Sequence, residues 1–238
     1  RIQDALYRIG SYVTHRLTAW NTGGEGIHSP RLFYIVRMLL YDTNGYYGWN
    51  EIEERRQAML HAPKLIRVDD YGTGQSGQRL VQDIAKTSLC SVKEGRMYFR
   101  LVNYLSREKK VKNPDGRLAI LELGTSLGIS AAYLAIPDSG NRVITIEGSR
   151  EVAEMAKMNW QKLGIRNVEC VEGNIDDVLG ITLKNMCAHA HGDLVLLDAN
   201  HTQEATLRYF GQISEFVCDS PILIVDDIHY SREMNEAW

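Results

Sequence analysis

Short apolar runs separated by helical patterns limit what the second half of this chain can fold into. Five such runs cover residues 118–123, 142–146, 168–171, 194–197 and 222–225. Helical patterns lie between them, at residues 129–135, 150–163 and 203–216. Strands that alternate with helices and are apolar throughout are typical of a parallel sheet that is covered on both sides. We therefore predict an α/β fold with a Rossmann-like parallel sheet and helices on both faces.

The first half of the chain is predicted to be mainly helical. Apolar residues recur at steps of three and four from Ile2 to Trp20, and further helical patterns cover residues 30–40, 51–61, 79–88 and 94–107. The polar, glycine-rich stretch 69–77 lacks the Gly-Lys-Ser/Thr ending of a phosphate-binding loop, so we interpret it as a flexible connection. The predicted regions are a helical N-terminal region, residues 1–116, and a Rossmann-like domain, residues 117–238.

Composition excludes several classes of protein. The net charge of -3 shows no basic excess, so we predict no nucleic-acid partner. No apolar run approaches the roughly 20 residues that span a bilayer, so we predict no membrane segment and a cytoplasmic location. The cysteines lack the spacing of a zinc motif, and a disulfide framework is not expected in a chain of this size. Because the sequence begins with Arg1 rather than Met, we expect a shortened form of a longer chain.

The first two predicted strands end in residues suited to a nucleoside. Ligands of open α/β sheets bind beyond the carboxyl ends of the strands. Gly124 and Gly128 permit a tight turn there, although Ser126 departs from the dinucleotide-binding G-x-G-x-x-G pattern. Glu147, 23 residues after Gly124, can accept hydrogen bonds from both hydroxyls of a ribose. The alternative for Glu147 is an exposed acid that stabilises the start of the next helix.

The third predicted strand is followed by polar residues that could read a base. Asn174 or Asp176 could contact the edge of an adenine. For Asp176 the competing interpretation is an N-cap of the following helix, since aspartate is favoured at that position.

Three carboxylates follow the last two predicted strands. Asp198 ends one strand, and Asp226 and Asp227 end the other. Buried like charges repel one another and need a counter-charge, and carboxylate oxygens favour magnesium, calcium or manganese over zinc. The alternative is that one or two of them cap the helices that follow. His201 could face the same site as a general base, because histidine readily exchanges a proton near neutral pH, and His229 is a weaker candidate.

Taken in order, these residues resemble the class I S-adenosylmethionine-dependent methyltransferases, and among them the metal-dependent O-methyltransferases of the catechol and caffeoyl-CoA type. The resemblance covers roughly residues 118–238. It implies that magnesium or a similar ion is held by Asp198, Asp226 and Asp227. It also implies an S-adenosylmethionine site formed by Glu122, Gly124, Thr125, Ser126, Gly128, Ser130, Glu147, Gly148, Asn174, Asp176 and Asp198.

One departure from that family concerns the base. The catechol type has a lysine three residues after the first acid, where this chain has His201, so His201 and Asp198 are the implied catalytic residues. This histidine resembles the branch that methylates sugar hydroxyls of macrolides and similar natural products, which implies a small hydroxylated acceptor. The family's sheet has two more strands after the fifth, and we expect them to be missing because this chain stops at Trp238. By analogy the N-terminal region covers the site or forms a homodimer contact.

Other functions remain open on the sequence alone. A metal-independent methyltransferase acting on nitrogen or on a macromolecule usually has an Asn/Asp-Pro-Pro-aromatic signature, whereas residues 198–201 read Asp-Ala-Asn-His. A protein that holds S-adenosylmethionine or a nucleoside without catalysis would need no set of three carboxylates. An NAD-dependent oxidoreductase is disfavoured because the third glycine of its motif is absent.

Overall fold

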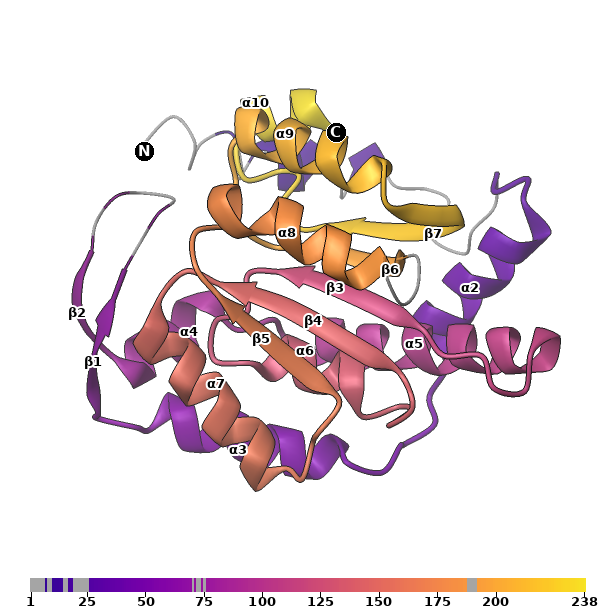
Figure 1. The fold of residues 1–238 in the computed structure, drawn as a ribbon. Coiled ribbons are helices and arrows are strands. Elements are labelled where there is room, and N and C mark those ends of the chain that lie inside the picture. The colour runs from indigo at the N-terminus through magenta and orange to yellow at the C-terminus, as the bar shows by residue number, and fades with distance from the viewer. Residues whose placement is uncertain are drawn as a thin grey trace.

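The computed structural model describes residues 7, 10–14, 17–18, 26–69, 71, 74, 76–187 and 192–238. Its centre is a five-stranded sheet in the order β5-β4-β3-β6-β7, in which all neighbouring strands are parallel (Figure 1). The strands are β3 (Ala119–Leu123), β4 (Arg142–Glu147), β5 (Val168–Glu172), β6 (Gly192–Leu197) and β7 (Val217–Val225). All five predicted strands are therefore present, and the predicted parallel sheet is confirmed.

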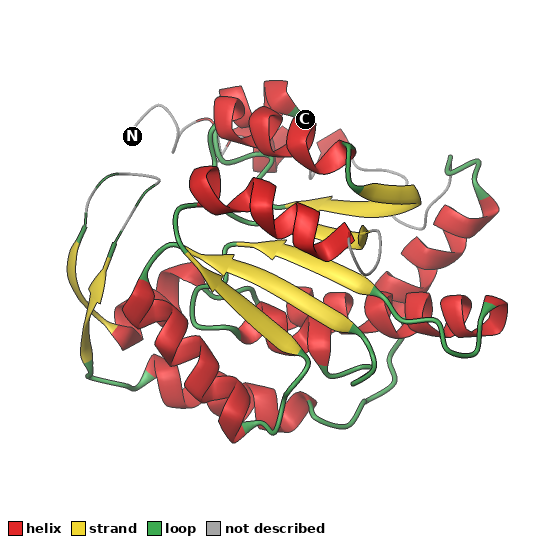
Figure 2. Ribbon diagram, in the orientation of Figure 1, coloured by secondary structure: helices red, strands yellow, loops and turns green. Residues whose placement is uncertain are grey.

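Helices cover both faces of this sheet (Figure 2). In β3, Leu121 and Leu123 pack with helices on one face, and Ile120 packs with helices on the other, because successive side chains of a strand point to opposite sides. One face carries α6 (Ile129–Ala135) and α7 (Arg150–Lys162), and the other carries α8 (Ile175–Cys187) and α9 (Gln203–Ser214). The short α10 (Arg232–Ala237) follows β7. The predicted α/β class is confirmed, although α8 was not predicted.

The N-terminal region supplies four described helices. They are α2 (Pro30–Tyr41), α3 (Trp49–Leu60), α4 (Val81–Ser88) and α5 (Val92–Lys112). Helix α5 begins with a capping box, in which Ser91 and Glu94 each accept a hydrogen bond from the other's backbone N–H. None of the described helices is long and apolar enough to cross a membrane. Of the predicted N-terminal stripe, Val13 and Leu17 are exposed helical residues, whereas Ile2, Leu6, Ile9 and Trp20 lie outside the described residues.

The stretch that we interpreted as a flexible connection is flanked by two strands, and that interpretation missed them. Strands β1 (Leu65–Val68) and β2 (Gly77–Leu80) pair antiparallel as a hairpin. Arg79 and Leu80, predicted to be helical, belong to β2. Ile66 is the single buried residue of the hairpin strands, so the apolar alternation that identifies a strand is absent.

The N-terminal helices and the sheet share one hydrophobic core. A single buried cluster contains Ile52 of α3, Phe99 of α5 and Ile120 of β3. Trp49 packs on Phe99, with ring centroids 5.5 Å apart, and Tyr46 contacts both rings. Tyr46 and Trp49 therefore serve packing. Residues 1–116, as far as they are described, lie against the predicted Rossmann-like domain rather than around a core of their own.

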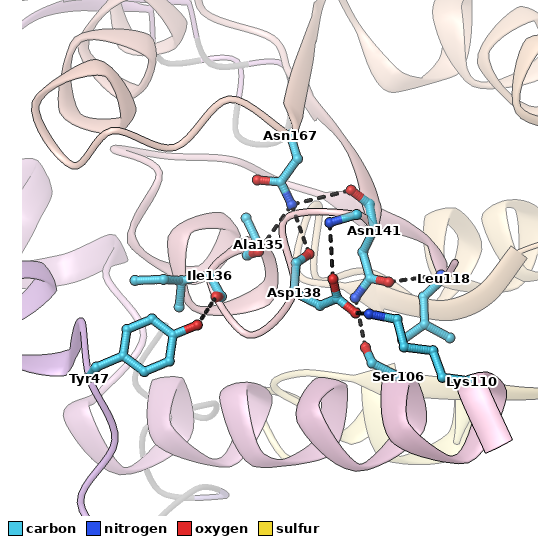
Figure 3. Close-up of polar contacts among 10 residues, drawn as sticks. Tyr47, Ser106, Lys110, Leu118, Ala135, Ile136, Asp138, Asn141 and Asn167 are labelled. Atoms are coloured by element: carbon cyan, nitrogen blue, oxygen red, sulfur yellow. Dashed lines mark hydrogen bonds and ion pairs between the residues drawn. The ribbon is translucent and has the colours of Figure 1, made fainter. Parts of the chain in front are cut away.

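A polar network joins α5 to the amino ends of the strands, at the edge of the sheet opposite the carboxyl ends (Figure 3). The Asn141 side chain accepts a hydrogen bond from the backbone N–H of Leu118 (2.9 Å) and donates one to Ser106 of α5 (2.7 Å). The Asn167 amide donates to the carbonyl oxygens of Ala135 and Asn141, at 3.0 and 3.2 Å. These bonds satisfy buried polar groups between the elements and fix how α5 lies against the sheet.

Candidate active site

A cavity of about 590 Å³ opens at the carboxyl ends of the parallel strands. This is the edge at which open α/β sheets bind their ligands. The structure brings ten of the predicted site residues to its wall, from the loops after β3, β4, β5, β6 and β7. They are Gly124, Ser126, Ser130, Glu147, Gly148, Asn174, Asp198, His201, Asp226 and Asp227.

Two predicted cofactor residues are buried beneath the glycine-containing turn instead. Glu122 is fully buried, and its carboxylate accepts a hydrogen bond of 2.6 Å from the Thr145 hydroxyl. Thr125 is also buried, with its hydroxyl 2.6 Å from that of Thr145. Burial raises the pKa of Glu122 to about 7, and hydrogen bonds from Ser130 and Thr145 oppose that rise. These residues support the turn from below and do not line the cavity.

Gly128 and Asp176 were also predicted to bind the cofactor, but they contact other parts of the protein instead. A β-carbon on Gly128 would lie 2.7 Å from Nε1 of Trp160, and that nitrogen donates a hydrogen bond of 2.8 Å to the Gly128 carbonyl. Asp176 forms a two-pronged ion pair with Arg208 of α9, at 2.9 and 3.1 Å. Neither residue lines the cavity. The structure thus assigns Gly128 to helix packing and Asp176 to a link between α8 and α9.

Gly124 allows the first and fourth strands of the domain to converge on the cavity. Its φ is +96°, a conformation that residues with a β-carbon rarely adopt. A β-carbon there would lie 2.0 Å from the carbonyl oxygen of Asp198. The backbone N–H of Asp198 donates to Leu123, which continues the pairing of β3 and β6 up to the turn. Because residue 124 is a glycine, no side chain covers the backbone at this point of the cavity wall.

Glu147 links two of the loops that line the cavity. Its carboxylate accepts hydrogen bonds from the backbone N–H groups of Ser126 (2.8 Å) and Ser149 (3.0 Å). Burial raises the pKa of Glu147, and these backbone donors partly oppose the rise. A carboxylate only accepts hydrogen bonds, and this one lines the cavity, where ligand hydroxyls could donate to it.

Backbone strain is concentrated on the cavity wall. Ser126, Asn200 and Asp227 are the non-glycine residues with positive φ in the described part of the chain, at +49°, +48° and +53°. All three line the cavity, and they follow three different strands. Left-handed conformations of such residues cost free energy and tend to occur at functional sites. The buried hydroxyl of Ser126 also has no hydrogen-bond partner among the described residues.

Acidic side chains dominate the part of the wall beyond β6 and β7. Burial, with repulsion from Asp226, Glu122 and Asp227, raises the pKa of Asp198 to about 8. Burial also raises the pKa of Asp226, although a backbone hydrogen bond from Asp227 opposes that rise. Glu94, at the start of α5, lines the same wall and adds to the repulsion at both.

His201 lies among these carboxylates. Its Nε2 is 3.8 Å from Oδ1 of Asp198 and 3.7 Å from Oδ2 of Asp227. The ring also faces Tyr230, with centroids 5.7 Å apart. These distances exceed those of direct hydrogen bonds, and they place the carboxyl groups of Asp198 and Asp227 beside the imidazole.

The three predicted metal ligands share the cavity wall without forming a closed ligand cluster. Within the described ranges, no group of three or more His, Cys, Asp and Glu side chains is arranged to hold a metal ion. His201 contacts two of the three predicted ligands. The predicted metal site therefore stays a prediction.

Comparison with known proteins identifies this part of the chain. A family model described as a methyltransferase domain matches residues 121–228, which begin in β3 and end just after β7. Residues 121–228 are therefore similar to a methyltransferase domain. The match includes the glycine turn, Glu147, Asp198, His201 and the pair Asp226 and Asp227. The resemblance to methyltransferases that the sequence showed is thus confirmed.

Solved structures share the fold of this chain. Cofactor-bound Rv0187 from MTB matches with 22% identity and a TM-score of 0.54, over 74% of this chain and 65% of that one. The SAH-bound methyltransferase PaMTH1 of Podospora anserina matches with 17% identity and a TM-score of 0.54, over 84% and 71%. The O-methyltransferase from Bacillus cereus in complex with SAH matches with 21% identity and a TM-score of 0.52, over 78% and 68%.

This chain covers only part of each of these structures, and the sequence identities are low. The chain spans slightly less than two thirds of the length of Rv0187, at 65%. No curated protein sequence matches it. At 17–22% identity the three structures establish the fold, and the chemistry has to be argued from the residues of this chain.

The cavity also has a wall of N-terminal residues, none of which the sequence analysis named as a site residue. It consists of residues from the β1–β2 hairpin, from α4, from the turn before α5 and from the first turn of α5. Those with polar or aromatic groups are Asp69, Tyr71, Arg79, Thr87, Ser88, Cys90 and Glu94. Burial raises the pKa of the Cys90 thiol to about 12, so this thiol stays protonated. The spacing of Ser91 and Glu94 marks the start of α5, but no local pattern shows that this start faces the sheet.

Proposed function

We propose that the chain binds S-adenosylmethionine in this cavity and transfers the methyl group to a hydroxyl oxygen of a small molecule. The observation that carries the proposal is that one cavity of a methyltransferase domain holds both Glu147 and the pair Asp198 and His201. Glu147 is suited to a ribose, and His201 is suited to removing a proton. They follow β4 and β6, which lie on either side of β3.

The cofactor would lie along the loops after β3, β4 and β5. Glu147 would accept hydrogen bonds from the ribose hydroxyls, and the bare backbone at Gly124 allows close approach. The unpaired hydroxyl of Ser126 offers a further contact. Asn174 lines the cavity after β5, where it can reach the edge of an adenine, whereas Asp176 is committed to Arg208. These contacts would place the sulfonium group toward β6.

Methyl transfer would be a direct displacement. The acceptor oxygen forms a bond to the methyl carbon as the carbon–sulfur bond breaks, and the sulfur leaves as a neutral thioether. His201 takes the hydroxyl proton, so the positive charge of the sulfonium ends on the imidazole beside Asp198 and Asp227. Holding oxygen and methyl in line is worth about 7–11 kcal/mol, and general-base help adds roughly 10²–10⁴-fold.

The carboxylates after β6 and β7 fit a hard divalent cation in their chemistry. Three carboxylates share one wall, and the raised pKa values of Asp198 and Asp226 show that their negative charge is poorly compensated. We propose that Asp198, Asp226 and Asp227 would hold magnesium or a similar ion. When bound, such an ion supplies positive charge that lowers the pKa of an acceptor hydroxyl.

Oxygen rather than nitrogen is proposed as the acceptor atom because of the residues after β6. The Asp-Ala-Asn-His sequence at 198–201 supplies an acid and a base for a hydroxyl proton, and it lacks the two prolines typical of amino-group methylation. The resemblance to enzymes that methylate sugar hydroxyls of natural products points to a small hydroxylated acceptor.

Calorimetric titration with S-adenosylmethionine and S-adenosylhomocysteine tests the proposal. Glu147→Ala is expected to raise Kd by roughly 10- to 100-fold, because hydrogen bonds to a charged group are lost. Glu172→Ala is a matched control, since Glu172 ends the neighbouring strand opposite Glu147 but pairs with Lys157 outside the cavity. A folded wild-type protein that binds neither compound would contradict the proposal. Repeating the titration with magnesium and with a chelator tests the metal separately.

A further inference from the structure

One wall of the cavity lies outside the matched domain and belongs to the β1–β2 hairpin. Tyr71, between the two strands, lies against Gly148, the residue after Glu147. A β-carbon on Gly148 would lie 2.6 Å from Cδ2 and 3.0 Å from Cε2 of the Tyr71 ring. Both residues line the cavity. The aromatic ring therefore occupies the space next to the ribose-binding carboxylate.

Three hydrogen bonds attach the hairpin to the loop after β4 and to α7. The backbone N–H of Arg67 donates to Glu151 (2.9 Å), and that of Asp69 donates to the Ser149 hydroxyl (3.2 Å). The Ser149 hydroxyl in turn donates to the Arg67 carbonyl (3.2 Å). Figure 1 shows the hairpin beside the end of the sheet to which the arrowheads of β4 and β5 point. These bonds end two residues before Tyr71, so they fix the position from which its side chain reaches Gly148.

We propose that Tyr71 belongs to the cofactor site and that its ring covers the adenosine part of the bound cofactor. This inference rests on the function proposed above and names a residue of the N-terminal region as a determinant of that site. The ring lies beside Glu147 and Gly148, whereas the acidic residues and His201 follow β6 and β7 on the far side of β3. Adenosine, not the acceptor, is therefore the group within its reach.

The chemistry of the ring suits a purine nucleoside. Tyr71 is 57% exposed, so it keeps a large aromatic surface that a ligand can cover. Aromatic side chains stack on the flat faces of bases, and they do so without reading hydrogen-bond donors or acceptors. Glu147 would select the ribose, and Tyr71 would add affinity for the base.

Binding of S-adenosylhomocysteine to Tyr71 variants tests the proposal. Tyr71→Ala is expected to raise Kd by about tenfold, and Tyr71→Phe to leave it nearly unchanged, because stacking needs the ring and not the hydroxyl. Tyr47→Ala is the matched control, since Tyr47 is 73% exposed and does not line the cavity. Adenosine alone should lose affinity for Tyr71→Ala by a similar factor. Because the side chain is largely exposed, the variants should keep the melting temperature of the wild type.

The contact with Gly148 gives an independent test. Gly148→Ala should displace the ring and raise Kd in the wild type, and it should have a smaller effect in the Tyr71→Ala background, where only the direct effect of the methyl group on the cavity wall is left. An unchanged or tighter Kd for Tyr71→Ala would overturn the proposal, and so would full additivity of the two changes. If the wild type bound neither S-adenosylhomocysteine nor S-adenosylmethionine, the proposed function itself would fail. A wild type that binds, with a Tyr71→Ala variant that binds equally well, removes only the role of Tyr71.

Discussion

Replacement of His201 by alanine is expected to lower the turnover number by about 100-fold or more, with the Kd for S-adenosylmethionine nearly unchanged. The imidazole lies near Asp198 and Asp227, after β6, whereas the proposed cofactor contacts come from the loops after β3, β4 and β5. Loss of a general base costs roughly 10²–10⁴-fold in rate. The measurement is formation of S-adenosylhomocysteine with a hydroxylated acceptor found by screening, at saturating concentrations of both substrates.

His229→Ala provides the matched control for that experiment. His229 is an exposed residue just after β7 and does not line the cavity. Its replacement should leave turnover unchanged, which also tests the weaker alternative base that the sequence suggested. Equal losses of turnover and cofactor affinity in His201→Ala would argue against a base and for a general disturbance of the cavity.

The centre of the sheet could be predicted because β3, β4 and β6 are buried on both faces. β3 is buried at all five positions, so its apolar run needs no alternation and stands out from its surroundings. Helix α8 could also have been predicted, because its fully buried residues Leu179 and Leu183 are four positions apart. No helix was predicted there. The β1–β2 hairpin could not be predicted, because it is held by hydrogen bonds to Ser149 and Glu151 rather than by an apolar face.

The sequence predicted which backbone positions lie near the site, but not the direction in which each side chain points. Residues directly after a strand, such as Glu147 and Asp198, reach the cavity because the strand ends there. Glu122 lies inside β3, which is buried at all five positions, so its side chain is buried as well. Tyr71 comes from a segment 76 residues before Glu147, and its place on Gly148 depends on how the hairpin packs. Such long-range packing leaves no mark in a local pattern.

Replacement of Asp198 by asparagine is expected to increase stability and to decrease activity. Asp198→Asn should raise the free energy of unfolding at pH 8, without metal, by about 2 kcal/mol, because it removes a buried and repelled negative charge. The same change should abolish methyl transfer, since it removes a partner of His201 and a proposed metal ligand. Chemical denaturation of both proteins at several pH values measures the first effect, and the acceptor assay measures the second.

The pH dependence of that difference follows from the raised pKa of Asp198. The pKa is about 8 in the folded protein and 3.8 as the ordinary value, so the folded state binds the proton more tightly between these pH values. The stability that this proton contributes is complete below about pH 4 and is lost as the pH rises through 8, whereas asparagine shows no such loss.

A second aspartate of the same strand supplies the contrast. Asp193, at the other end of β6, accepts hydrogen bonds from Lys109 (2.6 and 2.7 Å) and from the Ala119 backbone (2.9 Å). Asp193→Asn should therefore destabilise the fold at the pH where Asp198→Asn stabilises it. If the carboxylates hold a divalent cation, excess magnesium should raise the melting temperature of the wild type but not of Asp198→Asn. Parallel pH profiles of the free energy of unfolding for the wild type and Asp198→Asn would show that this carboxylate is not destabilised by its surroundings. The electrostatic reason for a cation at this wall would then be lost.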